Sequence, residues 1–162
     1  MRFTVHPICE QDVEEIASWK YDPPYSIYNL EKKDIPILLD AKNRYFSIYD
    51  ESQRIIGFCC FGEQAKVAGG VYSENEPDIL DVGLGLHPSM VGRGRGIAFV
   101  DAILRSASDD FSPIKFRVTI ADFNVRSQKT FLGLGFTQVG EFIRPSDSMK
   151  FVQLERNAIW IE

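Results

Sequence analysis

Short segments along the chain show hydrophobic residues either at helical spacing or in runs bounded by turn residues. Val13, Ile16 and Trp19, for example, recur near helical spacing. Helices are predicted at residues 10–20, 31–42, 94–106 and 124–134. Strands are predicted at residues 2–8, 44–50, 54–62, 78–86, 115–121, 136–143 and 149–155. The predicted order of elements is β-α-α-β-β-β-α-β-α-β-β.

The order of these elements predicts how the sheet is connected. The helix at 94–106 joins the strands at 78–86 and 115–121, so these two strands should be parallel neighbours. The rest of the order favours antiparallel pairing. The sequence therefore predicts an α/β (α+β) fold with a mixed, mostly antiparallel sheet flanked by helices. With 162 residues and no repeat, residues 1–162 are predicted to form a single domain.

Composition narrows the class of protein. Hydrophobic residues make up 44% and charged residues 25%, an ordinary balance for a soluble domain. No apolar run is long enough to cross a bilayer and no signal segment is present, so we expect a cytoplasmic protein without a membrane partner. The formal net charge of −5 argues against a nucleic-acid partner and is compatible with a cationic substrate such as an amine.

The cysteines and histidines indicate neither disulfides nor a metal site. The chain has three cysteines, of which Cys59 and Cys60 are adjacent and should point to opposite faces of a strand. Reduced structural thiols are therefore expected. With two histidines and no clustered Cys/His spacing, no metal is expected.

The most informative segment is LGLHPSMVGRGRGIA at residues 84–98, where a strand leads into a helix. Its last seven residues, 92–98, are called the glycine-rich turn below. Backbone N–H groups at a helix start have no intrahelical partner, and the helix dipole adds partial positive charge. Such a site suits phosphate or pyrophosphate, and glycines let the backbone approach it closely. Arg93 and Arg95 add positive charge.

Three phosphate-binding patterns compete for this turn. A Walker loop requires Gly-Lys-Ser/Thr at its end, but Gly96 is followed by Ile97 and Ala98. A dinucleotide-binding turn expects an acid on the following strand, and KFRVTIA has none before Asp122. Residues 93–98 instead resemble the Arg/Gln-x-x-Gly-x-Gly/Ala signature of the GNAT acetyltransferases. A glycine-rich turn with two solvated arginines remains the structural alternative.

The resemblance implies which residues bind the cosubstrate, acetyl-CoA. In the family, backbone amides at this turn hold the pyrophosphate of coenzyme A. The residues implied here are Arg93, Gly94, Arg95, Gly96, Ile97 and Ala98.

A second segment supports the same resemblance. NVRSQKTFLGLGF at residues 124–136 resembles the GNAT segment with an Asn, a short helix, an aromatic residue and Gly-Phe. Asn124 can cap the helix and Gly135 can end it. In the family this Asn also reaches the pantetheine or phosphate region, and Phe131 is expected to pack on the cofactor. Together the motifs span residues 78 to about 142, the expected acetyl-CoA core.

The resemblance also implies how the thioester is held. In the family the fourth and fifth strands splay apart, and the pantetheine arm pairs with backbone groups of the fourth, here Leu84 and Leu86. A backbone N–H of that strand would polarise the thioester carbonyl. Gly83 and Gly85 fit a strand against which another backbone packs, with a bulge or a weak strand as the alternative. The implied reaction is direct attack by a primary amine, from a small molecule or a protein N-terminus or lysine.

Proton transfer has candidates but no single assignment. The amine must lose a proton, and Asp81 is the leading candidate for the base, acting through a water. The alternatives are a solvated strand acid at position 81, or a base at Glu74, Glu76 or Asp78. Phe131 stands where many family members have a tyrosine thought to protonate the thiolate, and Phe lacks a hydroxyl. Other hydroxyls that could serve are those of Tyr21, Tyr25, Tyr28 and Tyr72.

The acceptor remains open. Tyr25 and Tyr28, in the aromatic-rich segment at 21–29, are predicted to line a pocket and offer cation–π contacts, with a merely packed loop as the alternative. A second class of function is a non-catalytic acyl-CoA-binding sensor or interaction module, which the missing tyrosine and the unassigned base motivate. The sequence leaves the amine, and whether the protein forms a homodimer, undecided.

Overall fold

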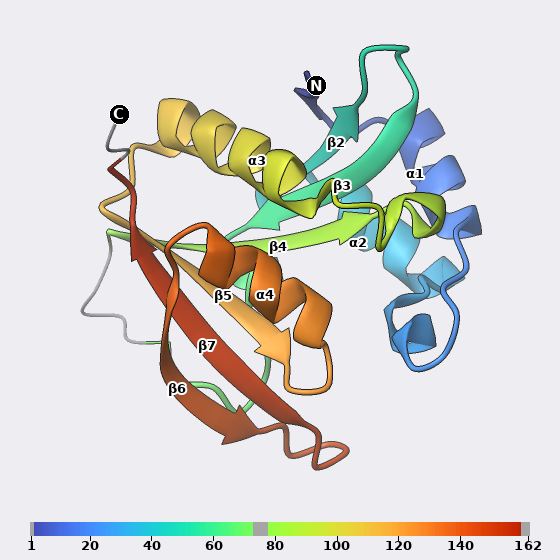
Figure 1. Cartoon of the computed structure of the whole chain (residues 1–162). Helices are drawn as coiled ribbons and strands as arrows, with labels where there is room; N and C mark the ends of the chain where they lie inside the picture. The colour runs from blue at the N-terminus through green and yellow to red at the C-terminus, as the bar shows by residue number, and fades with distance from the viewer. Residues whose placement is uncertain (1, 73–77, 160–162) are drawn as a thin grey trace.

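The computed structural model describes residues 2–72 and 78–159 (Figure 1). In this part of the chain, seven strands form one sheet in the order β1-β2-β3-β4-β5-β7-β6. The strands are β1 (Thr4–Pro7), β2 (Tyr45–Tyr49), β3 (Ile55–Phe61), β4 (Ile79–Leu86), β5 (Lys115–Ala121), β6 (Thr137–Ile143) and β7 (Lys150–Asn157). The α-helices are α1 (Glu10–Ser18), α2 (Ile35–Leu39), α3 (Gly96–Phe111) and α4 (Val125–Gly133).

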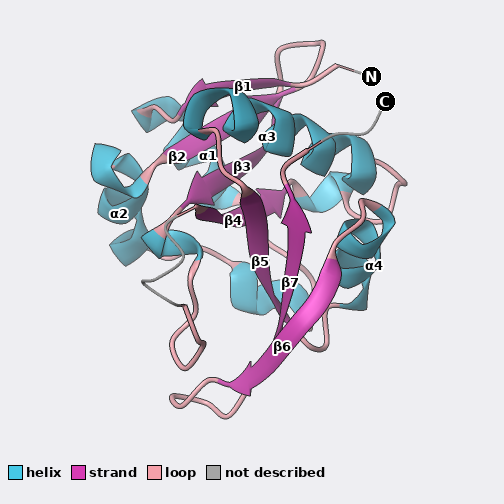
Figure 2. Ribbon diagram, turned by 90° about the vertical axis from the view of Figure 1, so that its left-hand side faces the viewer, coloured by secondary structure: helices cyan, strands magenta, loops and turns pink. Residues whose placement is uncertain are grey.

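The predicted order of elements and the fold class are confirmed. The strands β4 and β5 are parallel neighbours, and every other neighbouring pair in the sheet is antiparallel. Figure 2 shows β7 between β5 and β6, with β6 at the edge of the sheet. This insertion of the last strand is a tertiary arrangement that the element order leaves open.

The helix predicted at residues 31–42 is wrong in its length. The chain forms a 3-10 turn η2 (Lys32–Asp34), the short α2, and a second 3-10 turn η3 (Ala41–Asn43). Pro36 lies in the first turn of α2, and the side chain of Asp40 accepts a hydrogen bond from the Lys42 N–H. An Asp that bonds to nearby backbone favours a new turn over continuation of a helix.

Helices cover both faces of the sheet and create two hydrophobic clusters. Figure 1 shows α3 and α4 on one face and α1 and α2 on the other. The larger cluster joins α3 to the sheet through residues such as Phe99, Ile103 and Phe116. The smaller one joins α1 and α2 to the sheet through Val13 and Leu38, among others. The strands β2 and β3 therefore contribute to both clusters, whereas β6 at the edge of the sheet is largely exposed.

The predicted splay of the central strands is present. The parallel strands β4 and β5 pair only at Ile79↔Lys115, Leu80↔Phe116 and Asp81↔Arg117. Beyond that point they diverge, as Figure 1 shows. Each keeps its outer neighbour, because β3 pairs with residues 82–86 and β7 pairs with the whole of β5. A gap in the sheet thus opens after Asp81 and Arg117.

Other expectations have separate outcomes. Cys59 lies in the larger cluster, Cys60 pairs with Gly83 in the sheet, and all three cysteines are free thiols. Within residues 2–72 and 78–159, no helix combines the length and apolarity needed to cross a membrane. A cytoplasmic location stays a prediction.

Candidate active site

The backbone of β4 presents hydrogen-bonding groups to the gap. The His87 N–H donates to the Ile56 carbonyl over 2.7 Å, and the Gly62 N–H donates to the Asp81 carbonyl over 2.9 Å. Odd-numbered residues of β4 therefore point their backbone groups toward β3. Because this direction alternates along a strand, the N–H and C=O groups of Leu84 and Leu86 point into the gap. Pairing of a pantetheine arm with these groups stays a prediction.

Glycine is required at two positions of β4 for a different reason from the one expected. A Cβ atom on Gly83 would lie 2.9 Å from the sulfur of Cys60, and one on Gly85 would overlap the ring of Phe58. Cys60 and Phe58 are the cross-strand partners of these glycines on β3. The space is therefore filled by side chains of the neighbouring strand, and not by a second backbone.

The glycine-rich turn has the geometry of an anion site. Gly92 and Gly94 have φ values of +77° and +73°, a region that glycine adopts readily and other residues rarely do. No side chain among the described residues caps the start of α3. The N–H groups of Gly96, Ile97 and Ala98 are consequently available to an external anion.

Gly96 also sets the distance between α3 and α4. A Cβ atom at this position would lie 3.1 Å from Oγ1 of Thr130 on α4. That contact is tight for a methyl group and leaves no room for a longer side chain without displacement. The second glycine of the signature therefore keeps the start of α3 close to the middle of α4.

Two arginines of the glycine-rich turn, and a third beside it on α4, pair with no acidic side chain in the described part of the chain. Arg93, Arg95 and Arg126 form no ion pair with any carboxylate among the described residues. A Cβ atom placed on Gly92 would lie 3.3 Å from the guanidinium Nη1 of Arg126. In a chain with a net charge of −5, this local excess of positive charge marks the turn as a place for an anion.

The start of α4 is held by Asn124, as the sequence predicted. Its Oδ1 accepts a hydrogen bond from the Ser127 N–H over 3.2 Å, which caps the helix. Its Nδ2 donates to the hydroxyl of Tyr28 over 3.2 Å. Gly135, just beyond the end of α4, has a φ of +91°, in agreement with its predicted role. Contact between Asn124 and a cofactor stays a prediction.

Phe131 lies inside the larger cluster. It is 2% exposed, and its ring packs edge-on against Phe136 at 5.1 Å between centroids. A ring so buried serves first to hold α4 on the sheet. Its predicted contact with the cofactor stays a prediction.

The two candidate substrate tyrosines are docked on the start of α4. They lie in a 3-10 turn, η1 (Tyr25–Tyr28), within residues 21–29, called the aromatic loop below. The Arg126 Nε donates to the Tyr25 hydroxyl over 3.2 Å, and the guanidinium lies 4.3 Å from the centroid of that ring. Phe123 stacks on Tyr28 with centroids 6.2 Å apart. Tyr25 and Tyr28 thus stand beside the cofactor motif, and their contact with an acceptor stays a prediction.

The other hydroxyls have distinct partners. Tyr21 donates to the Leu86 carbonyl over 2.7 Å, so its hydroxyl lies at the gap, and burial raises its pKa to about 12. The hydroxyl of Tyr72 lies 2.8 Å from Oγ1 of Thr119 on β5. Of the four candidate tyrosines, Tyr21 has its hydroxyl on the strand predicted to hold the thioester.

Asp81 is placed at the fork between β4 and β5 and is engaged on both oxygens. The Arg117 Nε donates to Oδ1 over 2.7 Å and Nη2 donates to Oδ2 over 2.9 Å. Both side chains are buried, and the hydrogen bond to Asp81 raises the pKa of Arg117. This geometry is that of a structural ion pair, and it leaves little capacity for the carboxylate to accept an amine proton. The base assignment stays a prediction with this geometry against it.

The rival acids lie elsewhere. Asp78 is exposed at the paired end of the two strands, where its carbonyl accepts hydrogen bonds from the Ile114 and Lys115 N–H groups. Glu74 and Glu76 lie outside the described residues.

Sequence reasoning missed Arg117, Arg126 and the position of the Tyr21 hydroxyl. Arg117 had a signal, since a charged residue in the middle of the apolar strand KFRVTIA requires a buried partner. The contacts of Arg126 and Tyr21 join residues 101 and 65 positions apart, and no local pattern predicts them.

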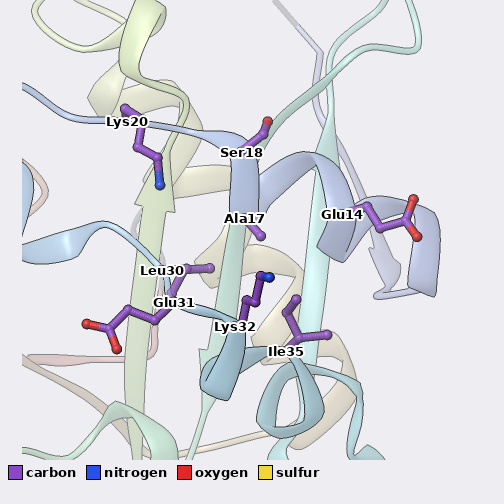
Figure 3. Close-up of a pocket in the computed structure, with 8 residues that line it drawn as sticks. All are labelled: Glu14, Ala17, Ser18, Lys20, Leu30, Glu31, Lys32 and Ile35. Carbon is purple, nitrogen blue, oxygen red and sulfur yellow. The ribbon is translucent and has the colours of Figure 1, made fainter.

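A separate groove of about 580 Å³ lies between α1 and the start of α2 (Figure 3). Figure 3 shows Ala17, Leu30 and Ile35 around its middle, while the carboxylates of Glu14 and Glu31 point away. Its lining contains none of the cofactor-motif residues. The groove therefore flanks the aromatic loop and is distinct from the gap in the sheet.

Comparisons with known proteins agree with this geometry. Residues 2–137 match the family described as acetyltransferase (GNAT) domain. No curated protein sequence matches the chain. A solved GNAT-family acetyltransferase from Bacillus anthracis superposes with a TM-score of 0.74 at 13% identity, covering 98% of this chain and 96% of that one.

Two further structures give the same result. The aminoglycoside acetyltransferase AAC(6')-Ib in complex with coenzyme A has a TM-score of 0.75 at 17% identity, covering 96% of this chain and 95% of that one. A spermidine N-acetyltransferase SpeG chimera from Vibrio cholerae and hSSAT has a TM-score of 0.73 at 13% identity, covering 98% and 96%. At these identities the likeness concerns the fold.

Together the splayed sheet and the glycine-rich turn define the GNAT type of acyltransferase fold. The chain belongs to the acetyltransferase (GNAT) domain family, because the family match spans most of its length. The resemblance stated from the two motifs is thereby confirmed.

Proposed function

We propose that the protein transfers an acetyl group from acetyl-CoA to a primary amine by direct attack, within one domain whose acetyl-CoA core is residues 78–142. The amine belongs to a small molecule or to a protein N-terminus or lysine. Structures with the same fold are named as acetyltransferases of spermidine and of aminoglycosides, which supports an amine acceptor. A cytoplasmic enzyme that requires no metal is part of the same proposal.

One observation carries the proposal. A gap lined by backbone groups of Leu84 and Leu86, with the Tyr21 hydroxyl on the Leu86 carbonyl, leads to the glycine-rich turn. That turn offers the free N–H groups at the start of α3 and guanidinium groups that pair with no carboxylate within residues 2–72 and 78–159. An extended arm that ends in a pyrophosphate fits this combination, and coenzyme A has that shape. The residues present therefore fit the cosubstrate.

The chain's own groups supply polarisation and orientation. Acetyl-CoA would supply the acetyl group as a thioester. The Leu84 N–H, which points into the gap, is the donor we assign to the thioester carbonyl. An alkyl thiol has a pKa near ~8.5, so the thiolate can depart near neutral pH without the tyrosine that Phe131 replaces. Tyr25 and Tyr28 are assigned to the acceptor side, where aromatic faces attract an ammonium group.

Substitution of Gly96 tests cofactor binding. Gly96→Glu should weaken acetyl-CoA binding by about 100-fold, or ~2.7 kcal/mol, because it adds bulk against Thr130 and a negative charge at the phosphate site. Gly96→Ala is the matched control and should cost only a fewfold loss, since Thr130 can shift slightly. Isothermal titration calorimetry with acetyl-CoA measures both. Equal affinity of folded Gly96→Glu and wild-type protein would refute the assigned site.

A screen of amine classes separates the enzyme from a sensor. Thiol release should be seen with one class of amine and should be lost in Gly96→Glu. Specific acetyl-CoA binding without transfer to any amine would instead support the non-catalytic sensor, which the buried positions of Asp81 and Phe131 favour.

A further inference from the structure

Arg126 contacts the two halves of the candidate site at once. It lies in the first turn of α4, where the helix dipole disfavours a cation. One side of its guanidinium faces the ring of Tyr25 at 4.3 Å, and its Nε donates to the Tyr25 hydroxyl. Its Nη1 lies beside Gly92 in the glycine-rich turn, where a Cβ atom placed on this glycine would be 3.3 Å away. An unfavourable position for a cation is thus combined with contacts to both substrate regions.

The Nη groups of Arg126 are available to a phosphate, and Nη1 lies beside the glycine-rich turn. A guanidinium has five N–H donors, and within the described part of the chain only the Nε–H has a hydrogen-bond acceptor. The four Nη–H groups carry no ion pair to a described carboxylate. Arginine binds phosphate through such groups while it stacks on an aromatic ring, and lysine lacks the planar fork needed to do both.

The aromatic loop is held together as one unit by hydrogen bonds between its own residues. The Tyr21 N–H donates to Oδ1 of Asn29 over 2.8 Å, which ties the two ends of the loop together. The Tyr25 N–H donates to the Asp22 carbonyl over 2.8 Å inside it. A contact that fixes Tyr25 would therefore restrain the whole loop, including Tyr28.

We propose that Arg126 is a positioning residue that couples occupancy of the phosphate site to the order of the aromatic loop. Resting on the proposed function, the inference adds a direction: phosphates of acetyl-CoA at the glycine-rich turn fix the guanidinium. The fixed guanidinium holds Tyr25, and with it the acceptor side.

Hydrogen exchange of the loop amides, measured with and without saturating acetyl-CoA, tests this coupling. In wild-type protein, acetyl-CoA should slow exchange at Tyr21, Tyr25 and Asn29 by about fivefold or more, the low end of typical coupling between sites. Arg126→Lys keeps the charge and should bind acetyl-CoA within about threefold of wild type. The slowing should nevertheless fall below about twofold.

Two further variants make the test specific. Arg93→Gln removes charge at the same turn without a contact to the loop, so it should lower affinity yet keep the full slowing at saturation. Tyr25→Leu removes the other partner and should abolish the slowing as Arg126→Lys does. Arg126 is exposed, and circular dichroism will show that each variant is folded.

The outcomes separate the two proposals. Loop exchange that does not change in wild-type protein while calorimetry shows acetyl-CoA binding overturns the role of Arg126 alone. Full slowing in Arg126→Lys overturns it as well. A wild-type protein that binds no acetyl-CoA overturns the proposed function, and the coupling with it.

Discussion

The two ends of the β4–β5 pair differ in whether their charged side chains form ion pairs. At the closed end, Asp81 and Arg117 neutralise each other in a buried, two-pronged ion pair at the last point where the strands touch. At the open end, Arg93, Arg95 and Arg126 have no described acidic partner, and the backbone of Leu84 and Leu86 faces the gap. The charges at the closed end are paired within the protein, whereas the arginines and backbone groups at the open end are available to a ligand.

The contrast shows how function can be located in an acidic protein. Most arginines that form ion pairs among the described residues lie away from the gap, as Arg54 with Asp50 and Arg144 with Asp147. A carboxylate beside the candidate site is therefore a poor indicator of function when an ion pair already neutralises its charge. Cations without partners beside free helix N–H groups are a better guide, because a protein gains little stability from them.

The largest expected effect lies at the closed end. Asp81→Asn should lower the free energy of unfolding by about 3 kcal/mol, because Arg117 would keep a buried charge without its counter-ion. Urea denaturation measures the change. Asp78→Asn is the matched control, since that exposed side chain lies just before the same strand, and it should cost less than about 0.5 kcal/mol.

The same variant decides the role of Asp81 in catalysis. A general base at this position predicts a rate loss of about 100-fold near neutral pH that shrinks as pH rises and the amine becomes neutral. An ion pair predicts an unchanged rate per folded molecule. We expect the second result, and a pH-dependent deficit in folded protein would restore Asp81 as the base.

The next effect concerns Tyr21 at the open end. Burial raises its pKa to about 12, so above pH ~10 the unfolded chain releases the proton while the folded protein retains it. The stability from the protonated hydroxyl is complete below pH ~10 and is lost between ~10 and 12. By pH 11 the loss is about 1.4 kcal/mol.

Tyr21→Phe removes this titration. Urea denaturation at pH 8 should show the variant about 1 kcal/mol less stable, because the hydrogen bond to the Leu86 carbonyl is gone. At pH 11 the difference should disappear or reverse. Phe keeps the ring, so packing is controlled within the variant itself. A difference that is the same at both pH values would contradict the buried, hydrogen-bonded hydroxyl.

The sequence predicted local features of this comparison well. The apolar runs within residues 78–86 and 115–121 predicted β4 and β5, and the intervening helix predicted that they are parallel. The glycine-rich turn is also local, because its positive φ angles and its free N–H groups follow from consecutive residues. Asn124 was predicted as a cap because capping acts over three residues.

Features that depend on distant residues were not predicted. Asp81 looks like a free strand acid until the parallel register places Arg117 opposite it. Gly83 and Gly85 suggest a passing backbone until Cys60 and Phe58 are seen across the strand pair. The length of the helix at 31–42 was overestimated. Its hydrophobic spacing suggested one continuous helix, but 3-10 turns interrupt it on both sides of α2.

The smallest effect separates two roles of Asn124. Asn124→Ala should lower the free energy of unfolding by about 1 kcal/mol, because the cap on the Ser127 N–H is lost. Asn124→Asp keeps an acceptor for that N–H and should stay within a few tenths of a kcal/mol of wild type. It cannot donate to Tyr28, however, and it adds a negative charge near the phosphate site.

Acetyl-CoA affinity should therefore follow the opposite order from stability. Calorimetry should show Asn124→Asp to be the weaker binder by a fewfold, while urea denaturation shows Asn124→Ala to be the less stable protein. If Asn124→Ala is worse in both measurements, the residue serves the open end only by capping α4. If the order reverses as expected, the charge at position 124 is felt by the ligand, and the open end extends from the glycine-rich turn to the start of α4.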